Sequence, residues 1–480
     1  MKIVHVASEL FPFMKTGGLA DAVGGLTRAL AEAGHEVSVF LPGYRAALDH
    51  PDADGAERVL RLQVELGSQF LAADLLRVAL GPRLTVYFIV RDEFFDRRFA
   101  YGTSERDYDD NAERFIFFTR AVAEALRLTD LKADVVHAHD WQTALLPVFV
   151  RLVERQHGTM LAAKTVFTVH NLAFQGVFPM STFGLANLPD EFRGIDGVEF
   201  FGQVNLLKAG LLFADRVTTV SPNYAREIQT AEFGCGLEGV VATRAADLVG
   251  LLNGIDDKVW NPATDLLLPA HYTADDLAGK ARCRHALLRK CGLDPEFAGP
   301  VYGVICRLTE QKGIDLLLGA RRFFERENCR LVVVGTGHNH YEEALTALAH
   351  SHPRRIAMAK VLDEPMAHLV EAGSDYFLMP SVFEPCGLNQ MYSQRYGSVP
   401  LCSRVGGLVD TVIDLDSDPA TGTGLLFAPT AEGFDWALYR SLHLFNDQET
   451  LGAVIRRGMA RDFGWPTAAH RYELLYQDAI

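Results

Sequence analysis

A carboxylate and a tight turn lie together where a strand is predicted to end, in residues 382–391 (Val-Phe-Glu-Pro-Cys-Gly-Leu-Asn-Gln-Met). An apolar run at residues 376–379 precedes them and is typical of a buried parallel strand, and a helical pattern begins at Leu388. The free N–H groups at such a helix start attract phosphate, and Glu384 places a carboxylate beside them. The turn through Gly387 therefore predicts a site for a sugar phosphate. The alternative is a helix-capping turn with a solvated glutamate.

Two basic residues share one predicted loop after another strand. Residues 301–306 predict the strand, and Arg307 and Lys312 follow in the loop Arg-Leu-Thr-Glu-Gln-Lys-Gly. An arginine binds two phosphate oxygens at once, whereas a lysine acts as a point charge. Together they predict a clamp on a diphosphate leaving group, whose growing negative charge they would stabilise without a metal ion. Two solvated basic residues are the alternative.

A glycine-rich loop follows the first predicted strand, residues 3–7. Lys15 supplies a mobile cation, and Gly17 and Gly18 allow the backbone to come close to a ligand. The spacing fits neither the GxxxxGK[ST] phosphate loop nor the GxGxxG dinucleotide fingerprint. The loop is a candidate ligand contact, although many glycine loops only turn the chain.

Histidines end two further predicted strands. Residues 135–141 are Val-Val-His-Ala-His-Asp-Trp, and His170 and Asn171 end the next strand. Open α/β sheets bind ligands at the carboxyl ends of their strands. His170 is therefore a candidate contact to a sugar or to developing charge, or else a structural histidine. His137 and His139 share one face of their strand, but no third histidine or cysteine lies nearby in the sequence, so we expect no metal site there.

Two acidic segments are weaker candidates for chemistry. Residues 107–110 (Asp-Tyr-Asp-Asp) resemble a cation site but lie in the polar segment 101–111, where a solvated loop is expected. Residues 414–416 (Asp-Leu-Asp) resemble a DxD motif but lie in a polar stretch that ends in Pro419. We interpret both as loops.

Alternating strand and helix patterns place these candidates in two domains. The alternation covers residues 1–252, with added antiparallel strands predicted between residues 60 and 90. It restarts at residue 301, after a connection that we place near residues 253–262, and continues to residue 455. This predicts two doubly wound α/β domains, residues 1–252 and 253–455, with a cleft between their strand ends.

Composition narrows the function classes. A chain of 480 residues is long enough for two or more domains, and 49% hydrophobic with 22% charged residues is typical of a globular protein. The net charge of -15 disfavours a nucleic-acid partner but not a neutral polysaccharide. No apolar run approaches the roughly 20 residues of a membrane span. Seven cysteines without a CxxC pair, and no signal-peptide pattern, predict a cytoplasmic protein.

With these motifs assembled, the sequence resembles the bacterial glycogen synthase and plant starch synthase family. The resemblance covers nearly the whole chain and rests on eight motifs, at residues 15–21, 137–141, 170–173, 206–210, 253–256, 307–313, 383–388 and 406–411. It implies the GT-B fold and transfer of glucose from ADP-glucose to the non-reducing end of an α-1,4-glucan, with retention and without a cofactor or metal. It also implies that the final segment, residues 456–480, packs back on the first domain.

The resemblance assigns roles to individual residues. The implied catalytic residues are Asp21 and His170 at the donor glucose, Arg307 and Lys312 at the phosphates, and Glu384 at the glucose hydroxyls. The implied substrate contacts are Lys15, Gly18, Tyr101, Asp140, Asn171, Asn253, Gly387 and Leu388, of which Tyr101 is a candidate acceptor or sugar contact.

Three positions depart from the common pattern of related enzymes. Tyr392 stands where many retaining GT-B enzymes have a second glutamate, in agreement with the glycogen synthase branch, and Asn389 replaces a frequent threonine. Leu362 stands where an aromatic ring commonly stacks on adenine, so UDP-glucose or another nucleotide sugar stays open as the donor.

Retention is compatible with two mechanisms, a covalent glycosyl–enzyme or front-face attack. We favour front-face attack because no unassigned carboxylate stands out as a nucleophile. A nucleotide-sugar epimerase, a phosphorylase and a non-catalytic glucan-binding protein are the other classes considered. The last is disfavoured because all five implied catalytic residues are present together.

Overall fold

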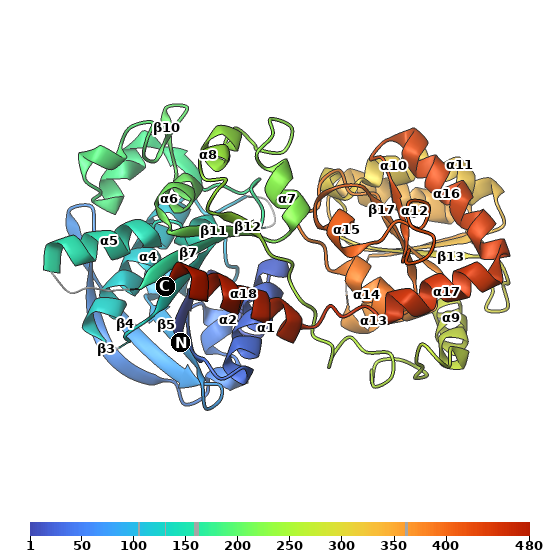
Figure 1. Cartoon of the computed structure of the whole chain (residues 1–480), viewed down its shortest axis with the longest axis horizontal. Helices are drawn as coiled ribbons and strands as arrows, with labels where there is room; N and C mark the ends of the chain where they lie inside the picture. Colours follow the sequence, from blue (N-terminus) through green and yellow to red (C-terminus); the bar gives the residue numbers. More distant parts are fainter. Residues whose placement is uncertain (104–105, 130, 158–162, 361–362) are drawn as a thin grey trace. The chain divides into compact units, whose positions relative to one another are not determined.

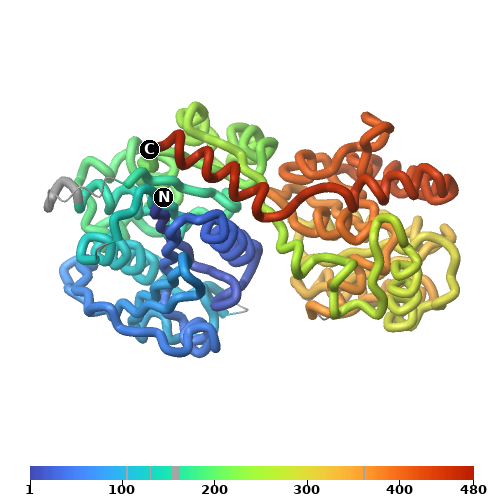
Figure 2. The backbone as a smooth tube through the Cα atoms, turned by 60° about the horizontal axis from the view of Figure 1, so that its bottom comes forward, coloured from blue at the N-terminus to red at the C-terminus, as the bar shows by residue number. Residues whose placement is uncertain are grey.

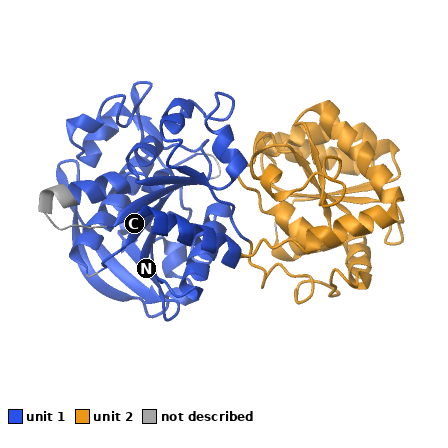
Figure 3. Ribbon diagram, viewed as in Figure 1, with its two compact units in different colours: residues 1–254, 465–480 blue, residues 255–464 orange. Residues whose placement is uncertain are grey.

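The chain forms two α/β units, each built around its own sheet (Figure 1). This computed structural model describes residues 1–103, 106–129, 131–157, 163–360 and 363–480. Unit 1 consists of residues 1–254 and 465–480, and unit 2 consists of residues 255–464 (Figure 3). Leu362, on which the choice of nucleobase depends, lies outside the described residues.

Within the described residues, unit 1 contains a nine-stranded sheet with the order β12-β11-β7-β6-β1-β2-β5-β4-β3. Its strands are β1 (Lys2–Val6), β2 (Glu36–Pro42), β3 (Glu57–Leu66), β4 (Gln69–Ala79), β5 (Leu84–Val90), β6 (Val135–His139), β7 (Lys164–Val169), β11 (Arg216–Thr219) and β12 (Leu248–Gly250). β3 and β4 are antiparallel additions, as predicted, but β5, in the same predicted range, pairs in parallel with β2 and belongs to the main parallel sheet. β1 pairs in parallel with β2 on one side and β6 on the other, so the strand order reverses beside β1. Ligands bind at such switch points in open α/β sheets.

Helices and short strands complete unit 1. Its helices are α1 (Gly18–Glu32), α2 (Arg45–Leu48), α3 (Asp92–Phe95), α4 (Asn111–Leu128), α5 (Leu146–His157), α6 (Leu206–Phe213), α7 (Pro222–Glu227), α8 (Glu238–Thr243) and α18 (Trp465–Ala479). A small sheet pairs β8 (Val177–Pro179), β10 (Gln203–Asn205) and β9 (Glu199–Phe200) in that order. α7 begins at a favourable cap, because the Ser221 hydroxyl accepts from the N–H of Tyr224 and Pro222 occupies the first turn.

Unit 2 contains, in its described part, a parallel six-stranded sheet with the order β15-β14-β13-β16-β17-β18. Its strands are β13 (Val301–Ile305), β14 (Arg330–Val334), β15 (Ile356–Ala359), β16 (Tyr376–Met379), β17 (Val399–Ser403) and β18 (Leu425–Phe427). Its helices are α9 (Ala278–Lys290), α10 (Ile314–Gly319), α11 (Arg321–Arg326), α12 (Asn339–Ser351), α13 (Glu364–Gly373), α14 (Asn389–Arg395), α15 (Gly406–Thr411), α16 (Ala431–Asn446) and α17 (Gln448–Met459). The order reverses between β13 and β16, which makes that pair the switch point of unit 2.

Both faces of the unit 2 sheet are covered. Along β14, Val333 belongs to one buried cluster, and Val332 and Val334 belong to another. The first cluster includes side chains of α11, α12 and α16, and the second includes side chains of α9 and α13. Because neighbouring residues of a strand point to opposite faces, the predicted doubly wound arrangement with helices on both sides follows (Figure 1).

The unit boundaries fall later in the chain than predicted. Residues 253 and 254 belong to unit 1, and residues 456–464 belong to unit 2. α17 runs to Met459, which is buried in the core of unit 2. The chain therefore leaves unit 2 only after this helix, and the part of the predicted C-terminal segment that returns to unit 1 begins at Trp465.

The last helix packs on α1 within unit 1, as the resemblance implied. A Cβ built on Gly25 of α1 would lie 1.9 Å from Trp465 Nε1, so only glycine leaves room for the buried indole. Near the other end of α18, the Tyr476 hydroxyl lies 2.8 Å from His137 Nδ1. Both chain termini lie in unit 1 (Figure 2). Among the described helices, none is long and apolar enough to cross a bilayer.

Gly25→Ala is expected to lower the thermal unfolding temperature, although alanine favours a helix by about 1 kcal/mol over glycine. The added methyl group would overlap the Trp465 ring and displace it from its buried position. Circular dichroism during heating measures the change.

Gly239→Ala is the matched control. Gly239 lies in α8 of the same unit, and a Cβ there meets nothing within 4 Å. This variant should be at least as stable as the wild type. An unfolding temperature for Gly25→Ala at or above the wild-type value would contradict the packing described for α18.

Candidate active site

A buried glutamate organises the glycine-rich loop after β1. The Glu9 carboxylate, in a residue only 4% exposed, accepts hydrogen bonds from the backbone N–H groups of Thr16 (2.6 Å) and Gly17 (3.2 Å). It also accepts from the hydroxyls of Thr16 (2.6 Å) and Tyr101 (2.8 Å). One carboxylate therefore fixes the loop that leads into α1. Glu9 was not predicted from the sequence, because a single glutamate forms no motif and its only signal is its place just after an apolar strand.

The predicted residues of this loop lie together at the start of α1. Lys15 Nζ is 2.8 Å from Asp21 Oδ1, and the two side chains are 49% and 28% exposed. An ion pair this open to water contributes little to stability, so both groups can exchange their partner for a ligand. A Cβ built on Gly18 meets nothing within 4 Å. The packing of the protein therefore does not itself require glycine at that position.

Asp140 and His170 join the ends of β6 and β7. Asp140 has φ 56°, a left-handed conformation that is costly for a residue other than glycine and is often found at functional sites. Its Oδ1 accepts a 2.7 Å hydrogen bond from the backbone N–H of His170. Burial raises the pKa of Asp140 to about 7, against the lowering effect of backbone hydrogen bonds from His170 and Asn171. Burial lowers the pKa of His170 to about 3, so its imidazole is neutral at pH 7.

Tyr101, predicted to contact an acceptor or sugar, braces Glu9. Its hydroxyl donates to Glu9 and lies 2.7 Å from the hydroxyl of Ser8. Burial and the charge of Glu9 raise the pKa of Tyr101 well above its usual value. The phenol therefore stays protonated as a donor to the carboxylate, and a direct contact with a sugar stays a prediction.

The two predicted asparagine contacts are less defined by the structure. Asn171 Oδ1 accepts from the N–H of Ala173 at 3.0 Å, so this side chain shapes the loop after β7. Asn253 is half-buried at the end of the first segment of unit 1. A role for either residue in substrate binding stays a prediction.

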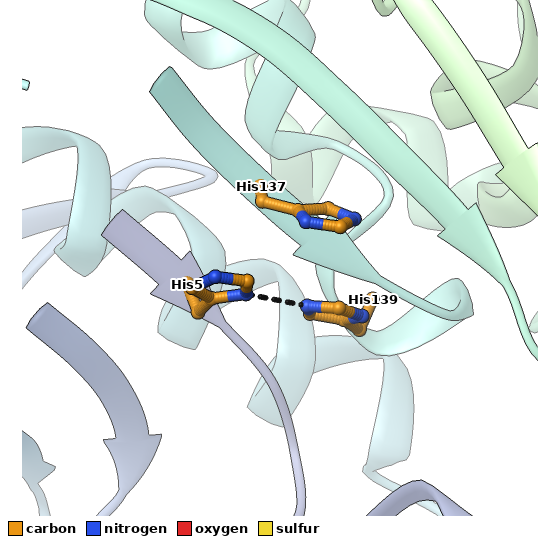
Figure 4. A group of neighbouring side chains, drawn as sticks. All are labelled: His5, His137 and His139. Atoms are coloured by element: carbon orange, nitrogen blue, oxygen red, sulfur yellow. Dashed lines mark hydrogen bonds between the residues drawn. The ribbon is translucent and has the colours of Figure 1, made fainter. Parts of the chain in front are cut away.

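Three buried histidines on the adjacent strands β1 and β6 lie close together (Figure 4). The third member, absent from the sequence prediction, is His5 on β1, which pairs in register with His137 on β6. His5 Nδ1 lies 3.0 Å from His139 Nε2, and His139 Nδ1 lies 3.0 Å from His170 Nε2. His137 uses both ring nitrogens, towards the hydroxyls of Tyr476 (2.8 Å) and Thr168 (2.6 Å).

Two groups of described residues have ligand atoms close enough to hold a metal ion. In the group His5, His137 and His139 the atoms lie within 4.8 Å of one another. Hydrogen bonds occupy both nitrogens of His137 and of His139, which explains this cluster without an ion. The group Glu310, His338 and His340 is exposed, and Glu310 pairs with His338 at 3.3 Å. We assign no metal to either group.

In unit 2 the predicted carboxylate and lysine form an ion pair at the switch point. Lys312 Nζ lies 2.6 Å from Glu384 Oε2, and the side chains are 25% and 7% exposed. The hydroxyl of Ser381 also donates to Glu384 Oε2, at 3.0 Å. Arg307 lies exposed at the start of the same basic loop. The structure thus brings the residues of two separate motifs to one edge of the sheet.

One backbone and one side-chain hydrogen bond hold the two loops at this edge of the sheet together. The N–H of Val382 donates to the carbonyl of Gln311 at 2.9 Å, and the Gln311 amide donates to the carbonyl of Phe383 at 3.3 Å. Gly313 has φ 66°, and a Cβ there would lie 1.8 Å from the carbonyl oxygen of Pro380. The basic loop therefore requires glycine at residue 313 in order to lie against the strand end of β16.

The turn into α14 is braced by side-chain amides. Gln390 Nε2 donates to the carbonyls of Cys386 and Gly387, both at 3.0 Å, and Gly387 has φ 69°. Asn389 Nδ2 donates to the carbonyl of Ile305 at 2.7 Å and so ties the start of α14 to the end of β13. The predicted contacts Gly387 and Leu388 are both partly exposed at this turn.

Tyr392, at the position of the second glutamate in related enzymes, has a structural role. Its ring stacks on Trp260 with centroids 3.8 Å apart, and Trp260 stacks on His368 at 3.9 Å. Tyr392 and His368 are buried, and the half-buried Trp260 packs against the buried cluster that includes α9 and α13. A carboxylate at residue 392 would have to replace one ring of this aromatic stack.

The two acidic segments are loops, as predicted, and ion pairs that the sequence did not predict hold both of them. Asp110 pairs with Arg97. Asp414 pairs with Arg404 at 2.8 Å, and Asp416 pairs with Arg440 at 2.8 Å. The carboxylates of Asp110, Asp414 and Asp416 are thus already matched by arginines.

Known proteins match both units. Residues 2–243 match the family model of the starch synthase catalytic domain, and residues 298–456 match that of glycosyl transferases group 1. The chain is 61% identical to a glycogen synthase of Opitutus terrae over 100% of both chains, and 46% identical to one of Anaeromyxobacter dehalogenans over 99% of both. The chain belongs to the glycogen and starch synthase family.

A solved structure of this family supports the fold. The catalytic domain of starch synthase IV from Arabidopsis thaliana, bound to ADP and acarbose, matches with a TM-score of 0.90. It is 34% identical, and the match covers 99% of each chain. The GT-B fold and the family membership inferred from the motifs are confirmed.

Asp140→Asn should change how stability depends on pH. The pKa of Asp140 is about 7 in the folded protein and its ordinary value is 3.8. Its contribution to stability is therefore fully present below about pH 3.8 and is lost as the pH rises through 7. An amide does not ionise, so the unfolding temperature of the variant relative to the wild type should rise between pH 4 and 7 and then level off. Thermal unfolding at each pH measures this difference, and a constant difference would refute the raised pKa.

Proposed function

We propose that the chain extends α-1,4-glucans by transferring glucose from ADP-glucose to their non-reducing ends, with retention of configuration. The observation that carries the proposal is the Lys312–Glu384 pair at the switch point of unit 2, in a chain 61% identical to a glycogen synthase. A cation and a carboxylate 2.6 Å apart match the two parts of a nucleotide sugar. The diphosphate is anionic, and the glucose carries hydroxyl donors.

The residues of unit 2 would bind the leaving group and the sugar. Arg307 and Lys312 would neutralise the charge that grows on the diphosphate as the sugar–phosphate bond breaks. Glu384 would accept hydrogen bonds from glucose hydroxyls, and the backbone N–H groups of Gly387 and Leu388 would donate to phosphate oxygens. Without donor, Lys312 compensates a carboxylate that is only 7% exposed, which would otherwise be buried without a counter-charge. Donor binding would exchange this ion pair for contacts to the substrate.

The residues of unit 1 would orient the glucose. Asp21 would hold the donor sugar, and Lys15 would add a cation at the diphosphate. His170 would contact the glucose as a neutral hydrogen-bonding group and through its backbone carbonyl. Asp140 also accepts a backbone hydrogen bond from Asn171, and the N–H of Asn171 lies in the same peptide unit as this carbonyl.

We favour front-face attack for the retaining step. The departing phosphate would take the proton of the acceptor hydroxyl, and the fixed cations would make a metal ion unnecessary. A covalent intermediate requires a carboxylate at the anomeric carbon. In unit 1, Glu9 is committed to the glycine-rich loop and Asp140 to the backbone of His170, so neither is placed to act as that nucleophile.

The proposed donor carries adenine. The Arabidopsis starch synthase IV structure contains ADP, and family membership extends this preference to the present chain. UDP-glucose is the alternative, because Leu362 replaces the expected stacking ring.

Purified protein with radiolabelled ADP-glucose or UDP-glucose and short maltooligosaccharides tests the proposal. Chain lengthening with ADP-glucose, at a rate at least tenfold above that with UDP-glucose, is the expected result. Release of epimerised nucleotide sugar would indicate an epimerase, and binding without turnover a non-catalytic protein. Absence of lengthening with either donor would refute the proposed function.

Lys312→Ala should lower kcat at least tenfold, equivalent to about 1.4 kcal/mol of transition-state stabilisation. Steady-state kinetics with ADP-glucose measures the loss, and thermal unfolding checks that the fold is intact. Lys290→Ala is the control, because Lys290 is an exposed lysine of the same unit at the end of α9. A near-normal kcat in Lys312→Ala would remove this residue from the mechanism.

A further inference from the structure

Two buried imidazoles connect the core of unit 1 to His170. His5 Nδ1 lies 3.0 Å from His139 Nε2 (Figure 4), and His139 Nδ1 lies 3.0 Å from His170 Nε2. His5 and His139 are 0% and 1% exposed and lie on the adjacent strands β1 and β6, and His170 follows β7. These three side chains, His5–His139–His170, form an unbroken hydrogen-bonded series that we call the imidazole chain.

The protons of the imidazole chain must all point the same way. Each link needs one N–H and one lone pair, and a neutral imidazole has one of each. Burial lowers the pKa of all three rings, so all are neutral at pH 7. If His139 carries its proton on Nδ1, it donates to His170 and accepts from His5. If it carries the proton on Nε2, both links reverse.

The buried end of the imidazole chain, at His5, favours one of these two proton arrangements. His5 Nε2 is a buried atom without a hydrogen-bond partner among the described residues. If His139 carried its proton on Nε2, His5 would carry its own proton on this unpaired Nε2 atom. Buried N–H groups without an acceptor are rarer than unpaired acceptors. The other arrangement leaves only a lone pair there. It gives His170 its proton on Nδ1.

We propose that His139 is a positioning residue for His170, which it holds in place as the tautomer with the proton on Nδ1. His170 Nε2 is then occupied by His139, and the Nδ1–H group becomes the ring donor for an oxygen of the glucose. This last step rests on the proposed function. The neighbouring His137 does not belong to the chain, because its nitrogens bond Tyr476 and Thr168.

Two substitutions at residue 139 separate positioning from simple packing. In His139→Asn the amide nitrogen takes the place of Nδ1 and can still donate to His170. In His139→Gln the amide reaches the position of Nε2, so the bond to His5 is kept and the bond to His170 is lost. We expect kcat within about threefold of wild type for His139→Asn. For His139→Gln we expect kcat at least tenfold lower, with KM for ADP-glucose changed less than threefold.

Tyr476→Phe is the control for a general loss of buried hydrogen bonds. It removes a 2.8 Å hydrogen bond to His137 in the same core, keeps the ring of residue 476, and removes no hydrogen bond of the imidazole chain. Its unfolding temperature should fall while its kcat stays at the wild-type value. Equal kcat losses in His139→Asn and His139→Gln would mean that residue 139 acts only through packing, and would overturn the proposal.

The tautomer itself can be measured without substrate. Nitrogen-15 NMR of histidine-labelled wild-type protein, with the His170 signals assigned by their loss in His170→Asn, should show a neutral ring protonated on Nδ1. Protonation on Nε2 would overturn the proposal. This test uses wild-type protein, so it holds even if the variants of residue 139 do not fold. Failure of the wild type to lengthen glucans would refute the proposed function, but it would leave this NMR result as an independent test of the imidazole chain.

Discussion

A buried carboxylate needs hydrogen bonds or a counter-charge, and the loops at both switch points are arranged around this requirement. In unit 1, Glu9 gathers the N–H groups of the glycine-rich loop. In unit 2, Glu384 gathers Lys312 and Ser381 from either side of the switch point. Both glutamates are buried. The loops are thus fixed before any substrate arrives, and this preorganisation is what electrostatic stabilisation of a leaving group requires.

The core of unit 1 extends this principle from charged to neutral polar groups. Thr168 lies between the hydroxyl of Thr218 and the ring of His137, and His137 in turn reaches Tyr476. A network of this kind is costly when one member is unsatisfied and specific when all are paired. It therefore fixes the register of β6, β7 and β11 and, through Tyr476, the position of α18.

The sequence was sufficient for the parts of the site that lie within single motifs. Each of the loops after β1, β6, β13 and β16 joins an apolar run to a helix start, and the loop after β7 directly follows an apolar run, so its place at a strand end followed from local patterns. Glu9 and His5 were not predictable in this way. Glu9 acts through residues of two other segments, and His5 meets His139 only because β1 pairs with β6, a long-range register that hydrophobic patterns do not specify.

The departures from the family pattern could be named from the sequence but not explained by it. Asn389 is useful because its amide reaches the carbonyl of Ile305, and Tyr392 because its ring completes a stack with Trp260. Both reasons depend on neighbours brought in by the fold. The return of the chain was likewise predicted too early, because only packing shows that Met459 still belongs to unit 2.

The placement of α18 has a consequence for how the protein is made. Unit 2 is one continuous stretch, residues 255–464, whereas unit 1 is completed by residues 465–480. Domains generally fold as units while the ribosome is still elongating the chain. Unit 1 is thus translated first but completed last. Until α18 emerges, His137 lacks its hydrogen bond to Tyr476, and α1 lacks its packing against Trp465.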